Sequence, residues 1–390
     1  MKKVVLLVET SRSSGRSILQ GIIRFAQENH CWSFFHQERS LYDPLDGSVR
    51  KWKPDGVIAR IENQRLADQL RALKVPIIDL LGWIPLQKIP SFGNDREKIS
   101  RMAYQHFKEN GFKHFAYCGY PGLDFSDQRG EHFRNIALED GQKIHLFFDE
   151  PRYGRLIDHE MKGFSHEKQI LRWLHSLPKP VGLLACNDLR AQQLLTLCEI
   201  NGLLVPEEIA ILGVDNDPIL TELCSPTLSS IELNNELLGL ESAKLLQQMM
   251  LGEKVSCHKR LIPPKKVVRR RSSDAFAFDN PDLALAKRFI QSSACSRISV
   301  GDVCDHVNIS SSTLKRLFRD QLKRTPKEEI LRVQIENAKE LLGLTMLSLK
   351  EIALRTGFLN PESFGKCFRK VTGMTPGTYR RMLQNVAGEK

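Results

Sequence analysis

SVGDVCDHVNI (residues 299–309) and SLKEIALRTGF (residues 348–358) are two copies of one sequence pattern near the end of this chain. Each copy is followed by a segment with apolar residues at helical spacing, and then by Thr-Pro at 325–326 and 375–376. A pattern that recurs at a nearly fixed spacing is typical of one supersecondary unit used twice. We therefore expect residues 299–379 to contain two copies of one small helical unit.

Each copy has the signals of a helix-turn-helix. Ser299 and Ser348 can cap a short first helix, because a hydroxyl can accept a hydrogen bond from an amide of the first turn. Asn308 and Gly357 then interrupt that helix, and both residue types tolerate the left-handed backbone of a turn. A second amphipathic helix is expected to begin shortly after each break.

The face of each second helix opposite its apolar stripe is polar and mostly basic. Its residues are Ser312, Lys315, Arg316 and Arg319 in the first copy and Glu362, Lys366, Arg369 and Lys370 in the second. Such a face suits the DNA major groove, where Lys and Arg reach guanine acceptors or phosphates. The alternative is the solvated surface of an ordinary helical domain, and the matching faces of two copies weigh against it.

Charge distribution supports this interpretation. The 390-residue chain carries a net charge of +11, of which +8 lies in residues 281–390 and +3 in residues 265–280. Residues 1–264 are therefore neutral, which is typical of a sensor attached to a polyanion-binding part. The nine cysteines form no CxxC pair and no zinc-ligand spacing with histidine, so we expect free thiols, no metal and no cofactor.

Two further compositional features concern localisation. No run of about 18 apolar residues occurs, so we expect no membrane partner. The apolar run after Lys2 and Lys3 is too short for a signal-peptide core and is better interpreted as a first strand. A cytoplasmic, nucleoid-associated protein is the expectation.

Residues 1 to about 260 alternate between apolar, β-branched runs and amphipathic helical segments. This alternation predicts an α/β fold with parallel sheets, and its length favours two lobes. Ligands of such sheets bind beyond the carboxyl ends of the strands. Polar residues at those ends are the loop 11–16 (with Arg16), Asn187 and Asp188, and the run Asp215, Asn216 and Asp217. The alternative for any one of them is simple capping of a helix or turn.

Two resemblances refine this picture. Residues 281–383 resemble the DNA-binding domain of the AraC family through Gly357-Phe358, Phe364, Phe368-Arg369, Thr375-Pro376 and Tyr379-Arg380. This resemblance implies two helix-turn-helix units joined by a long helix over 326–342. It also implies base-reading positions at Ser312, Lys315 and Arg316, and at Glu362, Gly365 and Lys366.

Residues 4–270 resemble the effector domain of the LacI family, which is itself similar to periplasmic sugar-binding proteins. The motifs are Asn94-Asp95, Gly111-Phe112, Arg129 with Phe133, residues 185–188, Val205-Pro206 and residues 213–217. The resemblance implies sugar contacts at Asp95, Arg129, Asn187 and Asp215, with Asp188 close by. The expected domains are thus a periplasmic-binding-protein-like sensor at 1–270, a linker at 271–280, and an all-α DNA-binding domain with two helix-turn-helix units at 281–390.

A LacI-like sensor placed ahead of an AraC-like domain resembles the arrangement of the xylose operon regulators. The resemblance implies a sugar-responsive transcription activator of xylose catabolic genes, with D-xylose or a related sugar as effector. Its partners would be a double-stranded DNA operator, a second copy of the chain in a homodimer, and RNA polymerase. One alternative is the same architecture responding to another pentose or a hexose. A remote alternative is an α/β enzyme, but the GxGxxG, GxxxxGK[ST] and GxSxG motifs are all missing.

Overall fold

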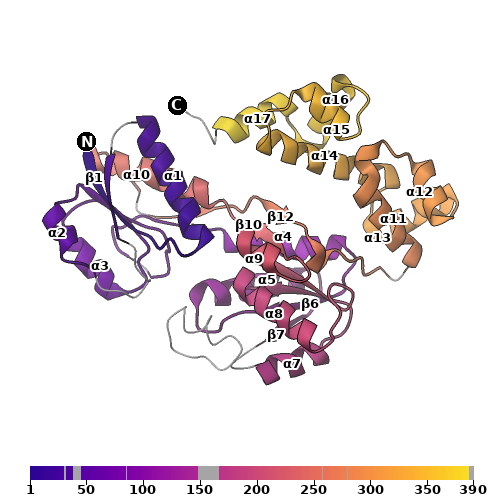
Figure 1. Ribbon diagram of the computed structural model, residues 1–390, viewed down its shortest axis with the longest axis horizontal. Coiled ribbons are helices and arrows are strands. Elements are labelled where there is room, and N and C mark those ends of the chain that lie inside the picture. Colours follow the sequence, from indigo (N-terminus) through magenta and orange to yellow (C-terminus); the bar gives the residue numbers. More distant parts are fainter. Residues whose placement is uncertain are drawn as a thin grey trace. The chain divides into compact units, whose positions relative to one another are not determined.

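The computed structural model describes residues 1–29, 32–37, 45–84, 86–147, 167–256, 258–278 and 280–385. Residue 279 of the expected linker and residues 386–390 of the expected C-terminal domain lie outside these ranges. The chain forms two compact units (Figure 1). The N-terminal unit comprises Met1–Lys108 and Phe112–Ala275, and the C-terminal unit comprises Glu109–Gly111 and Phe276–Lys390.

The N-terminal unit contains two six-stranded sheets, each the core of one lobe. The first sheet is parallel and has the strand order β11 (Lys259–Ile262), β5 (Ser91–Asn94), β4 (Ile77–Asp79), β3 (Gly56–Ala59), β1 (Lys2–Leu7) and β2 (Trp32–His36). The second has the order β12 (Lys266–Val268), β10 (Ser229–Glu232), β9 (Ile209–Asp215), β8 (Val181–Ala185), β6 (His114–Cys118) and β7 (Ile144–Phe147), with only β12 antiparallel. The predicted two-lobed α/β architecture is confirmed.

Helices cover both faces of each sheet, which is why the central strands are apolar throughout. In the first lobe, α1 (Ser13–Asn29) and α10 (Asn235–Met250) pack on one face and α2 (Ser48–Trp52) and α3 (Gln64–Arg71) on the other. The second lobe contains α4 (Arg96–Glu109), α5 (Asp124–Glu139), α7 (Glu167–Ser176), α8 (Asp188–Ile200) and α9 (Pro218–Leu223). The chain crosses between the lobes after β5, β10 and β11, so both lobes are built from segments far apart in sequence.

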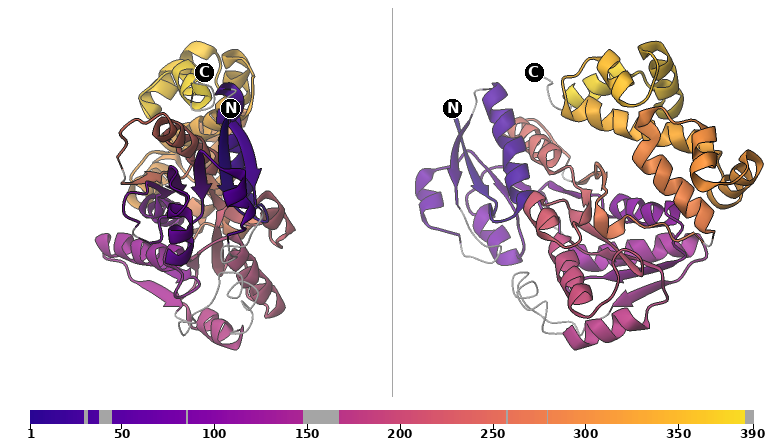
Figure 2. Two further views of the ribbon diagram at one scale, coloured as in Figure 1. Left: turned by 90° about the vertical axis from the view of Figure 1, so that its left-hand side faces the viewer. Right: turned by 45° about the vertical axis from the view of Figure 1, so that its right-hand side comes forward.

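Helices α1 and α10 lie side by side in unusually close contact (Figure 2). A Cβ atom on Gly21 would lie 2.0 Å from the carbonyl oxygen of Glu236, and one on Gly239 would lie 2.0 Å from that of Ile18. Each helix therefore requires a glycine where the two backbones meet. Because α1 follows the loop after β1 and α10 follows the crossing from β10, this contact fixes two segments that border the gap between the lobes.

The C-terminal unit is helical, as predicted, and consists of two small bundles that share one long helix (Figure 1). Its helices are α11 (Pro281–Ser293), α12 (Val300–Val307), α13 (Ser311–Leu322), α14 (Pro326–Leu344), α15 (Leu349–Arg355), α16 (Pro361–Thr372) and α17 (Pro376–Asn385). Helix α14 supplies Ile330 and Val333 to the first apolar core and Ile335 and Ala338 to the second. The long joining helix implied by the family resemblance is thus present.

The predicted caps and turns of both copies are confirmed. Ser299 with Asp302, and Ser348 with Glu351, form reciprocal capping boxes at the starts of α12 and α15. Asn308 (φ 59°) and Gly357 (φ 86°) both have left-handed backbones at the turns. These are local interactions within a few residues, so the sequence alone could predict them.

Candidate functional sites

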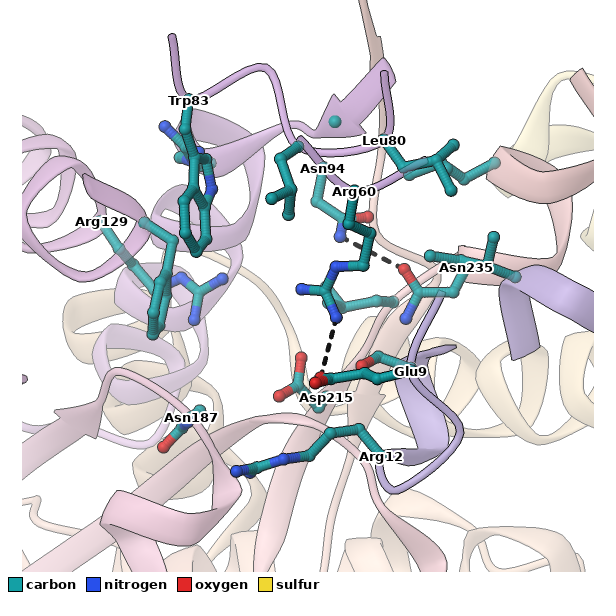
Figure 3. A pocket seen from close by; sticks show the side chains of 18 residues that line it. Glu9, Arg12, Arg60, Leu80, Trp83, Asn94, Arg129, Asn187, Asp215 and Asn235 are labelled. Carbon is teal, nitrogen blue, oxygen red and sulfur yellow. Dashed lines mark hydrogen bonds and ion pairs between the residues drawn. The ribbon is translucent and has the colours of Figure 1, made fainter. Parts of the chain in front are cut away.

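A cavity lies between the two lobes of the N-terminal unit, at the carboxyl ends of the strands. Its polar lining is Glu9, Arg12, Ser14, Arg60, Asn94, Arg96, Arg129, Asn187, Asp215 and Asn235, and its apolar lining includes Trp83, Phe125 and Leu80. Figure 3 shows Arg60 extending toward Glu9 and Asp215 in this space. The cavity encloses about 130 Å³.

The polar side chains of the cavity are partly paired with one another. Arg60 donates from Nη1 to Oε1 of Glu9 at 3.0 Å, and Asn94 donates from Nδ2 to Oδ1 of Asn235 at 3.2 Å (Figure 3). Arg129 donates from Nη1 to the carbonyl oxygen of Cys186. The Nε atoms of Arg60 and Arg129 and the Oδ1 atom of Asn94 are buried without a hydrogen-bond partner among the described residues. Buried groups of this kind are satisfied when a hydroxylated ligand or water supplies the missing partner.

Two aromatic rings meet across the cavity. Trp83 of the first lobe and Phe125 of the second are stacked with an interplanar angle of 21° and ring centroids 6.4 Å apart. The guanidinium of Arg129 lies 5.9 Å from the centroid of Phe125. The cavity thus combines an apolar wall with several hydrogen-bonding groups, as small-molecule sites usually do.

Asp215 is the acidic residue that the second lobe contributes to the cavity. Burial raises its pKa above the ordinary carboxyl value, although Arg129, Arg12 and Arg60 oppose the shift. Burial also raises the pKa of Asp188, and the negative charge of Asp215 raises it further. Asp188 accepts hydrogen bonds from Ser230 Oγ at 2.5 Å and from the backbone amide of Asp217 at 2.7 Å. It therefore supports the loop that carries Asp215.

The predicted effector residues fall into two groups. Arg129, Asn187 and Asp215 all line the cavity. The other four, Asp95, Asp188, Asn216 and Arg16, are not among its lining residues, and each bonds to nearby protein groups instead. Asp95 accepts from the backbone amide of Lys98 at 3.0 Å, Asn216 Oδ1 accepts from Arg270 at 2.9 Å, and Arg16 donates to the carbonyl oxygen of Thr10 at 2.6 Å.

Sequence reasoning missed several lining residues. Arg60 directly follows β3, so the strand-end rule could have found it. Asn94 and Asn235 lie at or beyond the ends of β5 and β10, and the rule would have found them had these short strands been predicted. Trp83 and Phe125 lie in a loop and in the first turn of a helix. No local sequence signal separates these two aromatic residues from others in the chain.

The predicted DNA-reading residues lie on α13 and α16. Ser312, Lys315, Arg316 and Arg319 are exposed on α13, and Glu362, Lys366, Arg369 and Lys370 are exposed on α16. Gly365 is half-buried, and no atom lies within 4 Å of the position that its Cβ would occupy. Within the described ranges, none of the basic residues on these faces forms a hydrogen bond or ion pair. Their charges are available to an anionic partner.

The basic segment 263–272 has a structural role. Residues 266–268 form β12, the edge strand of the second sheet. Lys265 pairs with Glu232 at 3.0 Å and Arg270 with Glu222 at 2.9 Å.

Within the described ranges, every helix is too short or too polar to span a bilayer. In the same part of the chain, no three His, Cys, Asp or Glu side chains are grouped so that they could hold a metal ion.

Comparison with known proteins agrees with this architecture. Residues 3–88 match the XylR N-terminal domain, residues 104–273 a periplasmic-binding-protein-like domain, and residues 303–382 a helix-turn-helix domain. The xylose operon regulatory protein of Haemophilus influenzae is 30% identical over 386 residues, which cover 97% of this chain and 98% of that protein. Its counterpart in Escherichia coli K12 is 28% identical over 395 residues, 98% of each chain.

Solved structures show the same fold. A structure of a xylose-binding transcription activator has a TM-score of 0.61 at 27% identity and covers 98% of both chains. A LacI family regulator from Enterococcus faecium with bound ribose has a TM-score of 0.56 at 18% identity and covers 71% of this chain, which is a likeness of fold alone. Together the sensor-like unit and the paired helix-turn-helix units define a transcription regulator. More specifically, the chain belongs to the family of xylose operon regulatory proteins.

Proposed function

We propose that this protein is a sugar-responsive transcription activator whose effector is D-xylose or a closely related aldose. The effector occupies the cavity between the lobes, and α13 and α16 bind a double-stranded DNA operator. The observation that carries the proposal is the polar cavity of a chain that matches a xylose operon regulator over 97% of its residues. The unpaired basic faces of α13 and α16 support the DNA partner.

The size and chemistry of the cavity support a monosaccharide. Its volume of about 130 Å³ is close to the roughly 150 Å³ of a cavity that binds one benzene ring. That supports a ligand with a single sugar ring. Carboxylates, amides and guanidinium groups bind several hydroxyl groups at once, and the apolar ring of Trp83 can cover one sugar face.

We assign roles to the predicted residues accordingly. Arg129, Asn187 and Asp215 contact the sugar, and Asp95, Asp188, Asn216 and Arg16 hold the surrounding backbone. On the DNA side, Ser312, Lys315 and Arg316 read bases in one major-groove segment. Glu362 and Lys366 read bases in the next, where Gly365 lets α16 approach the DNA closely. Arg319, Arg369 and Lys370 bind phosphates. DNA affinity should then fall steeply with salt, as expected when several phosphates are neutralised.

The wider proposal concerns organisation and partners. We assign the effector-binding domain to 1–270, the linker to 271–280 and the DNA-binding domain to 281–390. The protein acts in the cytoplasm as a homodimer on paired operator sites and recruits RNA polymerase. Sugar binding changes lobe closure, and closure changes how two subunits present their helices to DNA; a coupling of about 1–3 kcal/mol is sufficient.

The test is calorimetric titration of the full chain with D-xylose, L-arabinose, D-ribose and D-glucose, together with DNA binding with and without each sugar. We expect D-xylose to bind and to change DNA affinity about fivefold or more. If another sugar binds and D-xylose does not, the assigned effector changes, but the assignment as a transcription regulator stands. Chemical conversion of the sugar during the titration would instead favour an enzyme.

Matched arginine variants sharpen this test. Arg129→Gln removes a buried guanidinium that lines the cavity, so D-xylose affinity should fall by about tenfold or more, as for a charged hydrogen bond. Arg101→Gln is the control, because Arg101 pairs with Glu97 and Glu139 on the exposed surface of the same lobe. Equal affinities of the two variants would contradict the assignment of the cavity.

A further inference from the structure

Arg270 connects the cavity wall to the segment by which the chain leaves the N-terminal unit. It follows β12 with only Arg269 between them, and its side chain is only 16% exposed. Its Nη1 donates to Asn216 Oδ1 and to the carbonyl oxygen of Leu228, each at 2.9 Å, and its Nε donates to Glu222 Oε1 at 2.9 Å. A single guanidinium therefore joins three separate parts of the second lobe.

Asn216 is the residue next to Asp215 of the cavity wall. Asp215 (φ 116°) and Asn216 (φ 53°) are consecutive residues with positive φ, a conformation that L side chains rarely adopt. Such a backbone persists only when its surroundings hold it in place. The amide of Asn216 donates to Ser230 Oγ at 3.0 Å, and its side chain is held by Arg270. Asp215 thus faces the cavity while its neighbour is held by Arg270.

The segment after Arg270 is fixed to the same strands. Ser229 Oγ bonds to both the backbone amide and the carbonyl oxygen of Arg270, at 2.7 and 2.8 Å. Ser272 Oγ donates to the carbonyl oxygen of Ile211 on β9 at 2.7 Å and accepts from the amide of Ser229 on β10 at 2.9 Å. The N-terminal unit ends at Ala275, and the DNA-binding unit continues from Phe276.

We infer that Arg270 is a positioning residue that couples occupancy of the cavity at Asp215 to the path of the chain at 270–275. A ligand that binds Asp215 shifts the strained backbone of residues 215–216. Arg270 must then move with Asn216 or lose its hydrogen bond to the Asn216 side chain. If Arg270 moves, the segment 270–275 moves with it. The inference rests on the proposed function, because it concerns regulation from the same cavity.

The test measures two quantities on the full chain with D-xylose: calorimetric affinity for the sugar, and the ratio of DNA affinities with and without it. The variants are Arg270→Gln, which shortens the donor, and Asn216→Gly, which removes the side chain that accepts from Arg270 while glycine still adopts the positive φ. We expect each to bind D-xylose within about threefold of the wild type. In the wild type, D-xylose should change DNA affinity about 5–150-fold, the range of typical coupling. In each variant, the change should be less than about twofold.

Controls separate coupling from general damage. Lys265→Gln breaks the pair that the 42% exposed Lys265 forms with Glu232 on the same segment, and it should leave the ratio unchanged. Glu222→Gln alters a partner that is 62% exposed and should have a small effect. The double variant Arg270→Gln/Asn216→Gly should be no worse than either single variant, since both break one interaction. Melting temperatures of all variants should stay close together.

Two results on the variants would overturn the inference. One is an unchanged ratio in Arg270→Gln and Asn216→Gly. The other is a loss of D-xylose affinity in proportion to the loss of ratio, which would make both residues part of the sugar site. Failure of the proposed function is a different result, namely that the wild type does not bind D-xylose. The variants are then compared with whichever sugar of the panel does bind. If no sugar changes wild-type DNA affinity, the inference falls as well.

Discussion

The two helix-turn-helix copies share a backbone design but differ in their interiors. The second copy is packed around four aromatic rings, with successive centroid distances of 5.3, 5.5 and 5.3 Å from Phe358 through Phe364 and Phe368 to Tyr379. The first copy contains a buried ion pair instead. Lys287 of α11 and Glu329 of α14 lie 2.7 Å apart, and both side chains are 1% exposed.

The difference teaches that one local pattern can be stabilised in two ways. Capping boxes and left-handed turns fix where each helix begins and ends, and they recur in both copies. The interior then needs only to hold α13 and α16 in place, which either aromatic packing or paired charges can do. Aromatic packing tolerates small changes, whereas a buried charge cannot lose its partner without a large cost.

The largest expected effect comes from Glu329→Gln in the first copy. This change leaves the buried ammonium of Lys287 without its carboxylate, a situation that costs about 3–5 kcal/mol. Although burial opposes ionisation, Arg332, Lys287 and Arg324 hold the pKa of Glu329 well below its ordinary value. Urea unfolding monitored on the C-terminal unit of the full chain gives the free energy directly.

The sign of the pH dependence provides a second readout of Glu329. A carboxyl group whose pKa is lower in the folded than in the unfolded protein stabilises the fold at any pH above its unfolded-state pKa. This stabilisation is lost as the pH falls through the folded-state pKa. The wild type should thus lose stability toward acid pH more steeply than the variant. Glu336→Gln, which breaks the more exposed pair with Lys339, should change neither quantity measurably. A small effect of Glu329→Gln would remove the contrast between the two interiors.

The second-largest effect is expected from Gly357→Ala in the turn of the second copy. The left-handed backbone costs about 1–2 kcal/mol for a residue with a Cβ. That Cβ would also lie 2.6 Å from Nε2 of Gln334 and 3.0 Å from the carbonyl oxygen of Ala294, so overpacking adds a similar amount. We expect a total loss of about 2–4 kcal/mol by thermal unfolding. Asn308→Gly at the equivalent turn should change stability little, because glycine tolerates the same φ.

These turns and caps were predictable from sequence because their partners are a few residues away. The Lys287–Glu329 pair was not, because the two residues are 42 positions apart and each looks like a surface residue of an amphipathic helix. Strands β5 and β10 were missed for a related reason. Their sequences, SFGN and SSIE, lack an apolar run and become strands only by pairing with neighbours.

The cavity shows the same limit. The strand-end rule suggested Asn187 and Asp215, and the family resemblance added Arg129. The structure places all three around one space. It could not distinguish lining residues from their supports, since Asp188 and Asn216 follow the same strands as Asn187 and Asp215. Which of two adjacent side chains faces the cavity depends on the backbone at the strand end, here the positive φ of residues 215 and 216.

A third prediction compares the faces of α13 and α16 that we propose to read DNA. Arg316→Ala on α13 should weaken binding to the selected operator by about 1–3 kcal/mol, the usual value of a base contact, and should weaken random-sequence binding much less. Lys366→Ala on α16 should have a smaller effect on specificity, because Gly365 beside it offers no side chain for readout. Fluorescence anisotropy with both DNA types measures the two ratios. Equal losses on operator and random DNA would make Arg316 a phosphate contact.

The smallest effect, and the most informative about α16, is expected from Gly365→Ala. Glycine inside a helix is about 0.8–1 kcal/mol less favourable than alanine, and no atom lies near enough to resist a methyl group here. The variant should therefore be more stable than the wild type by up to about 1 kcal/mol. Since the fold does not require this glycine, its role in our proposal is close approach to DNA, and operator affinity should fall a few-fold while stability rises.

Gly377→Ala on α17, which also has open space around its Cβ position, is the control and should leave operator affinity unchanged. If operator affinity of Gly365→Ala stays at the wild-type value, α16 does not approach the groove at this position, and the first copy alone carries base readout.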